Sequence, residues 1–214
     1  MRARGAPAAL ALALVACGVE SRRAPDTSET TEPGSTAALP VPRAGGDAVG
    51  ARIEDAWLER WIGARVPLSG AGAARATLLR WWTDTCPSCE ASLPAVEELR
   101  TRYASRGLAT VAVYHPKPPR FESDAAVRAA AAERGYHGPL AVDGDWSALA
   151  RFWLDTGDRT ATSASFLVDA TGAIRFVHPG PEFHQVEGET DADHATCASD
   201  FRDLERAIEA LLDA

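Results

Sequence analysis

The sequence predicts an α/β protein in which a central mixed β-sheet is flanked by helices. Two apolar segments, 77–82 and 108–114, are predicted to be buried strands, and each precedes a helical pattern, as in parallel strands joined by crossover helices. Two further strand patterns, 165–168 and 173–178, flank the turn sequence Asp-Ala-Thr-Gly and predict an antiparallel hairpin. The order therefore indicates a parallel portion with one antiparallel edge.

Apolar periodicity and capping residues predict the first helices. A short amphipathic helix is expected within 53–62, and a longer one over 90–103, where Pro94 predicts a kink. The alanine-rich segment 123–134 is expected to be helical up to Gly135, because glycine readily adopts the positive φ of a helix end.

The last elements are short except for the closing helix. Segment 139–142 fits a strand and segment 146–154 a short helix. A final amphipathic helix is predicted over 201–212, with Ser199 or Asp200 as its N-cap.

Composition limits the classes of function. The 214 residues carry a net charge of -8, with a pI of about 5.1, which argues against a nucleic-acid partner because phosphates demand a basic face. No stretch is long and apolar enough to span a bilayer and remain in the mature protein. Four cysteines are too few for a disulfide scaffold, and no cofactor or resident metal is expected.

Residues 1–17 have the layout of a secretory signal, in which a basic start precedes the apolar run 8–16. The run ends in Leu-Val-Ala-Cys17, which resembles the lipobox of bacterial lipoproteins, whose cysteine is lipidated and becomes the new N-terminus. A plain signal peptide with an incidental Cys17 is the alternative. The lipoprotein prediction places the chain in the bacterial cell envelope, lipid-anchored to a membrane surface on the extracytoplasmic, periplasmic side.

Residues 18–50 are rich in Ser, Thr, Pro, Gly, Ala and Glu, as in the stretch SRRAPDTSETTEPGST. Such a composition offers little apolar surface to offset the entropy of ordering the backbone, so a disordered tether is predicted. The folded domain is expected to comprise residues 51–214.

The predicted chemistry lies in Cys86 and Cys89, which a strand precedes and a helix follows. Cys86 is expected at the helix N-terminus, with Pro87 at the first helical position, where a missing N–H costs nothing. Unpaired N–H groups and the helix dipole favour a thiolate there, which makes Cys86 the attacking nucleophile. Cys89, one turn further in, is expected to be more buried and to resolve a mixed disulfide on Cys86.

Two other interpretations of this cysteine pair exist. Half of a zinc site would need two further ligands, and the histidines and Cys197 offer no matching spacing. A purely structural disulfide is permitted in an exported protein, but so short a loop constrains little chain entropy. Redox chemistry is therefore the favoured interpretation.

Segments 77–99 and 163–180 resemble the redox segment and the late hairpin of TlpA/ResA-type thioredoxin-like proteins, which are exported and often membrane-anchored. The resemblance covers most of residues 63–214. It implies a thioredoxin-like fold and a thiol–disulfide oxidoreductase, with Cys86 attacking and Cys89 resolving. The implied partners are protein thiols and disulfides, together with a membrane electron donor or acceptor, and the expected role is that of a reductant in envelope maturation.

Three residues depart from the family pattern. Thr85 stands where a tryptophan is usual, Ser163 where a cis-proline faces the disulfide, and Ser92 where ResA-type members carry an acid. With serine, the peptide before residue 163 is expected to be trans and the hydroxyl to lie near the sulfur. The predicted neighbours of the active pair are Trp82, Thr85, Pro87 and Ser163.

Proton transfer must then rely on another group. Asp84, Glu90 or water are the candidates, although both carboxylates are more readily interpreted as solvated surface charges. The pair Trp81 and Trp82 is expected to serve core and rim packing. His115 has no required role in the family.

The segment between the hairpin and the last helix contains His178, His184, His194 and Cys197. Imidazole and thiolate suit copper and zinc, so a metal site is one interpretation. The favoured one is a surface loop with scattered histidines and an unpaired cysteine, because the spacings match no recognised ligand pattern.

Two rival functions remain. A peroxiredoxin-like thiol peroxidase is suggested by Thr83, three residues before Cys86, although Leu79 replaces the expected proline and Cys89 is close for a resolving cysteine. A thioredoxin-like copper chaperone, which is not an enzyme, would use Cys86, Cys89 and His178 or His184.

Overall fold

The computed structural model describes residues 38–185 and 192–214. The predicted signal at 1–17, with the lipidation site Cys17, lies outside the described residues, as does segment 18–37 of the predicted tether.

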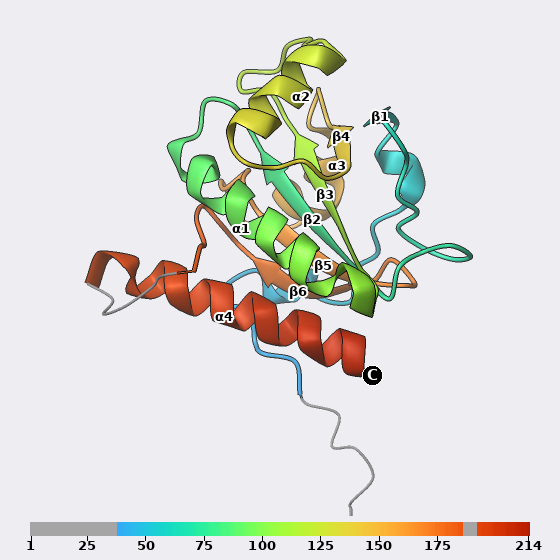
Figure 1. Cartoon of the computed structure of the whole chain (residues 1–214), viewed down its shortest axis with the longest axis vertical. Coiled ribbons are helices and arrows are strands. Elements are labelled where there is room, and N and C mark those ends of the chain that lie inside the picture. Colours follow the sequence, from blue (N-terminus) through green and yellow to red (C-terminus); the bar gives the residue numbers. More distant parts are fainter. Residues whose placement is uncertain (1–37, 186–191) are drawn as a thin grey trace, which may run out of the picture. The chain divides into compact units, whose positions relative to one another are not determined.

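Six strands form one sheet in the order β1-β4-β3-β2-β5-β6 (Figure 1). Strands β2, β3 and β4 are parallel, whereas β1 is antiparallel to β4, β5 to β2, and β6 to β5. The five predicted strands are confirmed to within one residue at either end, and the mixed sheet with them. The strands are β1 (Arg60–Ile62), β2 (Ala76–Trp82), β3 (Leu108–Tyr114), β4 (Leu140–Val142), β5 (Ser165–Asp169) and β6 (Ile174–His178).

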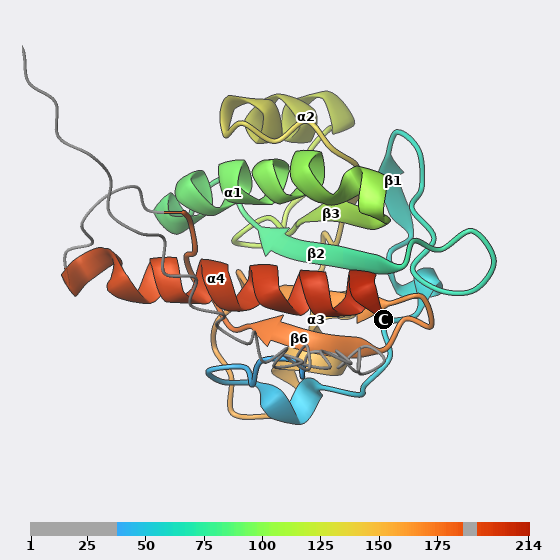
Figure 2. The ribbon, with the colours of Figure 1, turned by 60° about the horizontal axis from the view of Figure 1, so that its bottom comes forward.

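Helices cover both faces of the sheet. α1 (Pro87–Tyr103) and α4 (Ala192–Asp213) cross the same face (Figures 1 and 2), to which α2 (Asp124–Glu133) also contributes. α3 (Ser147–Leu149) and the π-helical turn Ala150–Leu154 pack on the other face. The α2 prediction is confirmed, since the hydroxyl of its N-cap Ser123 accepts from the Ala126 N–H at 3.2 Å.

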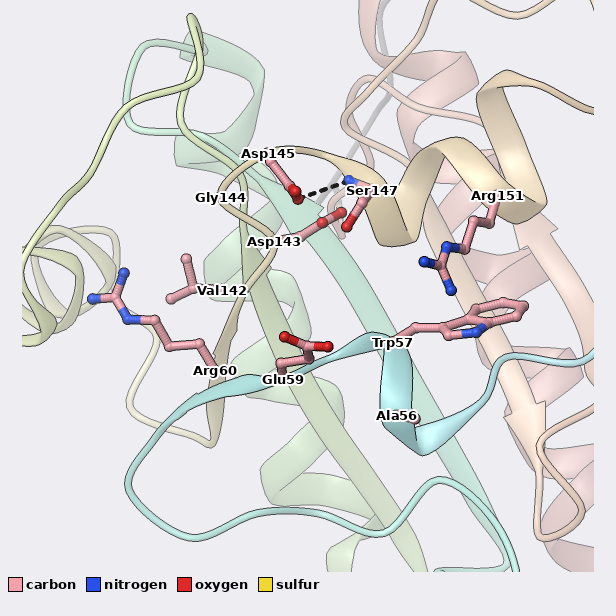
Figure 3. A pocket seen from close by; sticks show the side chains of 10 residues that line it. All are labelled: Ala56, Trp57, Glu59, Arg60, Val142, Asp143, Gly144, Asp145, Ser147 and Arg151. Carbon is pink, nitrogen blue, oxygen red and sulfur yellow. Dashed lines mark hydrogen bonds between the residues drawn. The ribbon is translucent and has the colours of Figure 1, made fainter.

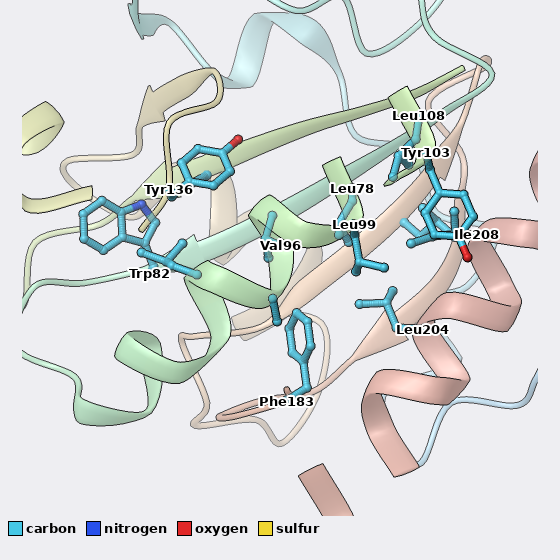
Figure 4. Close-up of a cluster of buried hydrophobic side chains, with 14 of the residues drawn as sticks. Leu78, Trp82, Val96, Leu99, Tyr103, Leu108, Tyr136, Phe183, Leu204 and Ile208 are labelled. Carbon is cyan, nitrogen blue, oxygen red and sulfur yellow. The ribbon is translucent and has the colours of Figure 1, made fainter. Parts of the chain in front are cut away.

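Strand β2 serves both halves of the core because every one of its residues is buried. Leu79 and Trp81 point to the α3 face, whereas Leu78 and Trp82 point to the α1 and α4 face. Figure 4 shows the latter cluster, which includes Leu78, Trp82, Val96, Leu99, Leu204 and Ile208. By this alternation the side chain of Arg80 lies on the α1 and α4 face, beneath the start of α1.

The helix predicted within 53–62 is wrong. Only Asp55–Trp57 forms a turn, of 3-10 type, and Arg60–Ile62 is the edge strand β1. The Asp55 carboxylate accepts from the Leu68 N–H at 2.8 Å, which ties the turn to a distant loop. Pairing of β1 with β4 satisfies backbone groups that a three-turn helix would have bonded internally, so tertiary context overrides the helical spacing.

The N-cap predicted for the last helix is also wrong, because α4 begins at Ala192 and Asp200 lies inside it. The Asp200 carboxylate is buried, lying 3.0 Å from His178 Nε2 and 3.0 Å from Arg43 Nη2. Arg43 belongs to a stretch assigned to the tether, and the Gly50 N–H nearby donates to the Ile174 carbonyl at 2.8 Å. Residues 38–50 therefore pack on the folded domain.

Candidate active site

Strand β2 ends at Trp82, and a three-residue loop places Cys86 at the N-cap of α1. Pro87 holds the first helical position, and the Cys89 N–H donates to the Cys86 carbonyl at 3.0 Å. Cys86 is half-buried and Cys89 fully buried, and both are thiols. The Cys86 sulfur is thus open to a partner, whereas the Cys89 sulfur is shielded. Both lie at the positive, N-terminal end of a 17-residue helix.

Ser163 lies between the two sulfurs. Its Oγ accepts from Cys89 Sγ at 3.5 Å and donates to Cys86 Sγ at 3.8 Å. The Thr162–Ser163 peptide is trans, since the described cis bonds are Lys117–Pro118 and Gly180–Pro181. Ser163 therefore stands where the resemblance expects a cis-proline. Its hydroxyl bridges the two thiols by accepting a hydrogen bond from one and donating a hydrogen bond to the other.

The pKa values of the two thiols are shifted in opposite directions. Partial burial raises the pKa of Cys86, but hydrogen bonds from the Cys89 thiol, the Ser163 hydroxyl and the Cys89 N–H, with the charge of Arg80, outweigh it, so the pKa is lowered. Full burial raises the pKa of Cys89, against the opposing effects of Arg80 and Ser163. This arrangement makes Cys86 the more acidic of the two thiols and therefore the better nucleophile, while Cys89 stays protonated at neutral pH.

Arg80 also lies at this site, although no sequence motif singled it out. Its side chain is completely buried and donates to the Ser163 carbonyl at 2.7 Å, to Ser165 Oγ at 3.3 Å and to the Pro181 carbonyl. A charged residue in the middle of a wholly buried strand was the available signal, because an unpaired buried cation is expensive.

The charge of Arg80 is directed at the cysteine pair. Burial lowers the pKa of the guanidinium, and the strongest opposing effects come from Cys89 and then Cys86. The carboxylate of Glu182 acts on it more weakly than either sulfur, and the hydrogen-bond acceptors named above are neutral. A thiolate is therefore the natural counter-ion of this buried cation.

Asp84 is not the solvated surface charge that was favoured. Its carboxylate accepts from Arg120 at 2.7 Å and from the Tyr114 hydroxyl at 3.1 Å. Burial raises its pKa, but these hydrogen bonds outweigh that effect and lower it. Asp84 thus stays anionic and braces the loop before Cys86, which makes it a poor proton acceptor, whereas Glu90 is exposed as expected.

The other predicted neighbours take different positions. Trp82 is fully buried, with its ring centroid 5.0 Å from that of Tyr114, so it packs beneath the loop. Thr85 is exposed, and its hydroxyl lies 3.5 Å from the Lys117 carbonyl. Pro87 is exposed beside Cys86. Thr85 and Pro87 therefore border the open side of the site, and Trp82 supports it from within.

Ser92 replaces the family's acid with a structural contact. Its buried hydroxyl accepts from the Phe183 N–H at 3.2 Å, and the Phe183 ring lies 5.4 Å from the Arg80 guanidinium. Together with the bond from Arg80 to the Pro181 carbonyl, this contact holds segment 181–183 against α1 and β2. No sequence signal pointed to this segment as a wall of the site.

The buried histidines do not join the sulfurs. Burial lowers the pKa of His115 to about 4, so the ring is neutral at physiological pH. His178 pairs with Asp200, and burial lowers its pKa as well. His184, His194 and Cys197 lie together, with one ligand atom of each within 4.8 Å of the others, and His178 is not part of this group.

A pocket of about 470 Å³ lies elsewhere, at the edge where β1 pairs with β4 (Figure 3). Its walls come from residues 56–60 and 142–151 and include none of the predicted catalytic or neighbouring residues. One wall residue, Asp143, is occupied in accepting from Trp81 Nε1 at 3.0 Å and from the Leu149 N–H at 2.9 Å. The pocket is therefore separate from the cysteine pair.

The fold and the site together define a class of protein. A mixed sheet of this topology, with a Cys-X-X-Cys pair at the N-terminus of the helix that follows a central strand, is that of a thioredoxin-like thiol–disulfide oxidoreductase. The chain belongs to the Redoxin family, which matches residues 48–195. The resemblance inferred from the two sequence segments is thereby confirmed at the level of the thioredoxin-like family.

Known relatives agree with this class. The chain is 26% identical over 120 residues to the thiol-disulfide oxidoreductase YkuV of Bacillus subtilis (strain 168). This match covers 56% of this chain and 77% of that protein. It is 26% identical over 110 residues to the protein DipZ of Mycobacterium bovis, but the match spans only 14% of that protein and 50% of this chain. The solution structure of a thioredoxin-like protein in its oxidised form superposes with a TM-score of 0.50 at 22% identity, covering 82% of this chain and 95% of that one, and supports the fold.

Replacing Ser163 tests its contact with the sulfurs. Ser163→Ala should raise the pKa of Cys86, because the thiolate loses one hydrogen-bond donor while the backbone stays unchanged. Ser163→Pro, the family residue, should change the Cys86 pKa or the redox potential as well. Alkylation rates followed across pH measure both variants, with Thr85→Ala as the control in the same site. An unchanged pKa in both Ser163 variants would contradict the assigned contact.

Proposed function

We propose that this protein exchanges disulfides with protein thiols through Cys86 and Cys89. The Cys86 thiolate attacks a substrate disulfide, so that a mixed disulfide forms and one substrate thiolate leaves. Cys89 then loses its proton and attacks the Cys86 sulfur, which releases the second substrate thiolate and leaves a Cys86–Cys89 disulfide. The substrate gains two electrons, and an electron donor must return the pair to the dithiol form.

The observation that carries this proposal is the contrast between the two sulfurs. Cys86 is accessible, sits at a helix N-terminus and has a lowered pKa, whereas Cys89 is buried and has a raised one. In such a pair the accessible sulfur attacks the substrate disulfide, and the buried sulfur reacts only afterwards, with the mixed disulfide. The substrate thiolate that leaves in the resolving step takes up the proton that Cys89 loses, and the Ser163 hydroxyl, which accepts from Cys89, can relay this proton by giving up its own.

Disulfide exchange with a protein substrate tests the proposal against its rivals. The reduced chain should reduce the interchain disulfides of insulin with stoichiometric loss of its Cys86 and Cys89 thiols. A thiol peroxidase would instead consume hydrogen peroxide much faster than insulin disulfides. A copper chaperone would bind one Cu⁺ through Cys86 and Cys89 and show little exchange. Either of these results in place of exchange would overturn the proposal.

Membrane tethering is the second part of the proposed function. The signal layout of residues 1–17 and the lipobox that ends in Cys17 support a lipid anchor on the extracytoplasmic face of a bacterial membrane. Among the residues that the structure describes, no helix has the length and apolar character needed to cross a bilayer. The membrane electron donor or acceptor would then meet the active site at the membrane surface.

Removing the lipidation site should release the protein. In a bacterial host that processes lipoproteins, the wild-type chain is expected in the membrane fraction, because acyl chains on Cys17 partition into lipid. Cys17→Ala should appear in the soluble or unprocessed fraction, while Cys197→Ala, which keeps the lipobox, should behave as wild type. Equal membrane association of the wild type and Cys17→Ala would contradict the anchor.

A further inference from the structure

Three potential metal ligands gather at one end of α4, outside the disulfide-exchange machinery. His194 and Cys197 lie three residues apart on α4, the spacing that places two side chains on one face of a helix. His184 reaches the same place from the segment that follows β6. One ligand atom from each residue lies within 4.8 Å of the others. The mechanism of disulfide exchange uses none of the three.

The two imidazoles of this cluster lie side by side. Their rings, those of His184 and His194, meet edge to face with centroids 5.2 Å apart. His184 Nδ1 also lies 3.1 Å from Glu182 Oε1, a close contact whose geometry does not make a hydrogen bond. Both imidazoles therefore border the same small region as Cys197.

Two of the three ligands lie on packed parts of the fold. His184 follows Phe183, which is fully buried and held by Ser92, and Cys197 is half-buried on α4. His194 is exposed near the start of the helix. Tetrahedral zinc holds neighbouring nitrogen and sulfur ligand atoms roughly 3.3–3.8 Å apart. The three ligand atoms already lie within 4.8 Å of one another, so reaching these distances requires side-chain shifts of about 1–1.5 Å at most.

We infer that His184, His194 and Cys197 bind a thiophilic d¹⁰ cation, Zn²⁺ or Cu⁺, with one coordination position left for water or another ligand. Two imidazoles and one thiolate form a donor set that both ions accept, whereas Mg²⁺ and Ca²⁺ require oxygen ligands. Binding converts the Cys197 thiol to a metal thiolate and releases its proton to solvent. His178 is not a ligand, because it is not among the residues whose ligand atoms lie within 4.8 Å of one another.

Competition titrations of the reduced full chain against a chromophoric chelator test the site, once with Zn²⁺ and once, without oxygen, with Cu⁺. One equivalent should bind to the Cys86→Ser/Cys89→Ser chain, which lacks the competing thiol pair, and the ion bound more tightly relative to its chelator standard identifies the preferred metal. In the same double-variant background, His184→Ala and Cys197→Ala should each weaken binding at least tenfold, whereas His137→Ala should not. The bound ion should also protect Cys197 from alkylation.

The cysteine pair is the necessary control, because two thiols can bind these metals by themselves. Binding should survive in the double variant Cys86→Ser/Cys89→Ser, which cannot exchange disulfides. Disulfide exchange should in turn survive in His184→Ala. Loss of metal binding in the double variant, or wild-type binding by both His184→Ala and Cys197→Ala, would overturn the inferred site. Absence of binding for both ions would do the same.

Discussion

Cys86→Ser is expected to abolish disulfide exchange, and Cys89→Ser to accumulate a mixed disulfide with the substrate. The first variant lacks the accessible nucleophile at the N-cap of α1. The second can still attack but has no buried thiol to resolve the intermediate. Non-reducing electrophoresis and mass spectrometry of each variant with a disulfide-bonded substrate detect the adduct. Full exchange by both single variants would contradict the assignment of roles.

The pH dependence of alkylation adds an independent measure of these roles. In the reduced wild type, Cys86 should react first, with a midpoint below the value of about 8.5 for an unperturbed thiol. The rate should rise as pH passes upward through this pKa, because only the thiolate reacts. Cys197→Ser serves as the control, since burial raises the pKa of Cys197 and its thiol should contribute little at neutral pH.

Much of this fold is predictable because its sequence signals are local. The strands 77–82 and 108–114 are continuous apolar runs, and the hairpin carries its turn sequence between two strands. The cysteine pair could be placed for the same reason, since strand, motif and helix are consecutive. By contrast, β1 is a three-residue edge strand whose pairing with β4 joins residues about eighty positions apart, which no local pattern encodes.

The missed parts of the site also depend on long-range contacts. Ser163 could be placed near the sulfurs only by resemblance, whereas Arg80, in a strand of known position, was not connected with them. Its acceptors lie at Ser163, Ser165 and Pro181, far along the chain. At His184 the sequence predicts only a loop with scattered histidines, because the three side chains that cluster there come from two segments with no recognised ligand spacing.

The buried guanidinium of Arg80 gives the second prediction with a large expected effect. Its charge acts more strongly on Cys89 than on Cys86, so Arg80→Met should raise the pKa of Cys89 in particular. Because Cys89 must lose its proton to resolve the mixed disulfide, each unit of pKa should slow resolution about three- to fourfold at neutral pH, since a tenfold loss of thiolate is partly offset by a more nucleophilic sulfur. The intermediate that Cys89→Ser traps permanently should then be visible transiently with both cysteines intact.

The same substitution should change the redox equilibrium. A buried cation stabilises the Cys86 thiolate and with it the reduced pair, so its removal should lower the reduction potential by about 30 mV for each unit by which the Cys86 pKa rises, to the extent that Cys86 is ionised at the working pH. This direction means that Arg80 makes the protein a weaker reductant than its fold alone would. The potential follows from equilibration with glutathione buffers, and Arg175→Met, on the outer strand β6, is the matched control.

Stability and charge must be separated in this experiment, because Arg80 also satisfies buried acceptors. Leaving the Ser163 and Pro181 carbonyls unpaired should cost about 1–3 kcal/mol each in the free energy of unfolding, measured by chemical denaturation. Arg80→Lys keeps the cation but loses the planar fork, so it should be destabilised while retaining much of the low Cys86 pKa. If the thiol pKa values and the potential of folded Arg80→Met equalled those of the wild type, the guanidinium would serve packing alone. A shift in Arg80→Met that Arg80→Lys largely reverses would assign the effect to its charge.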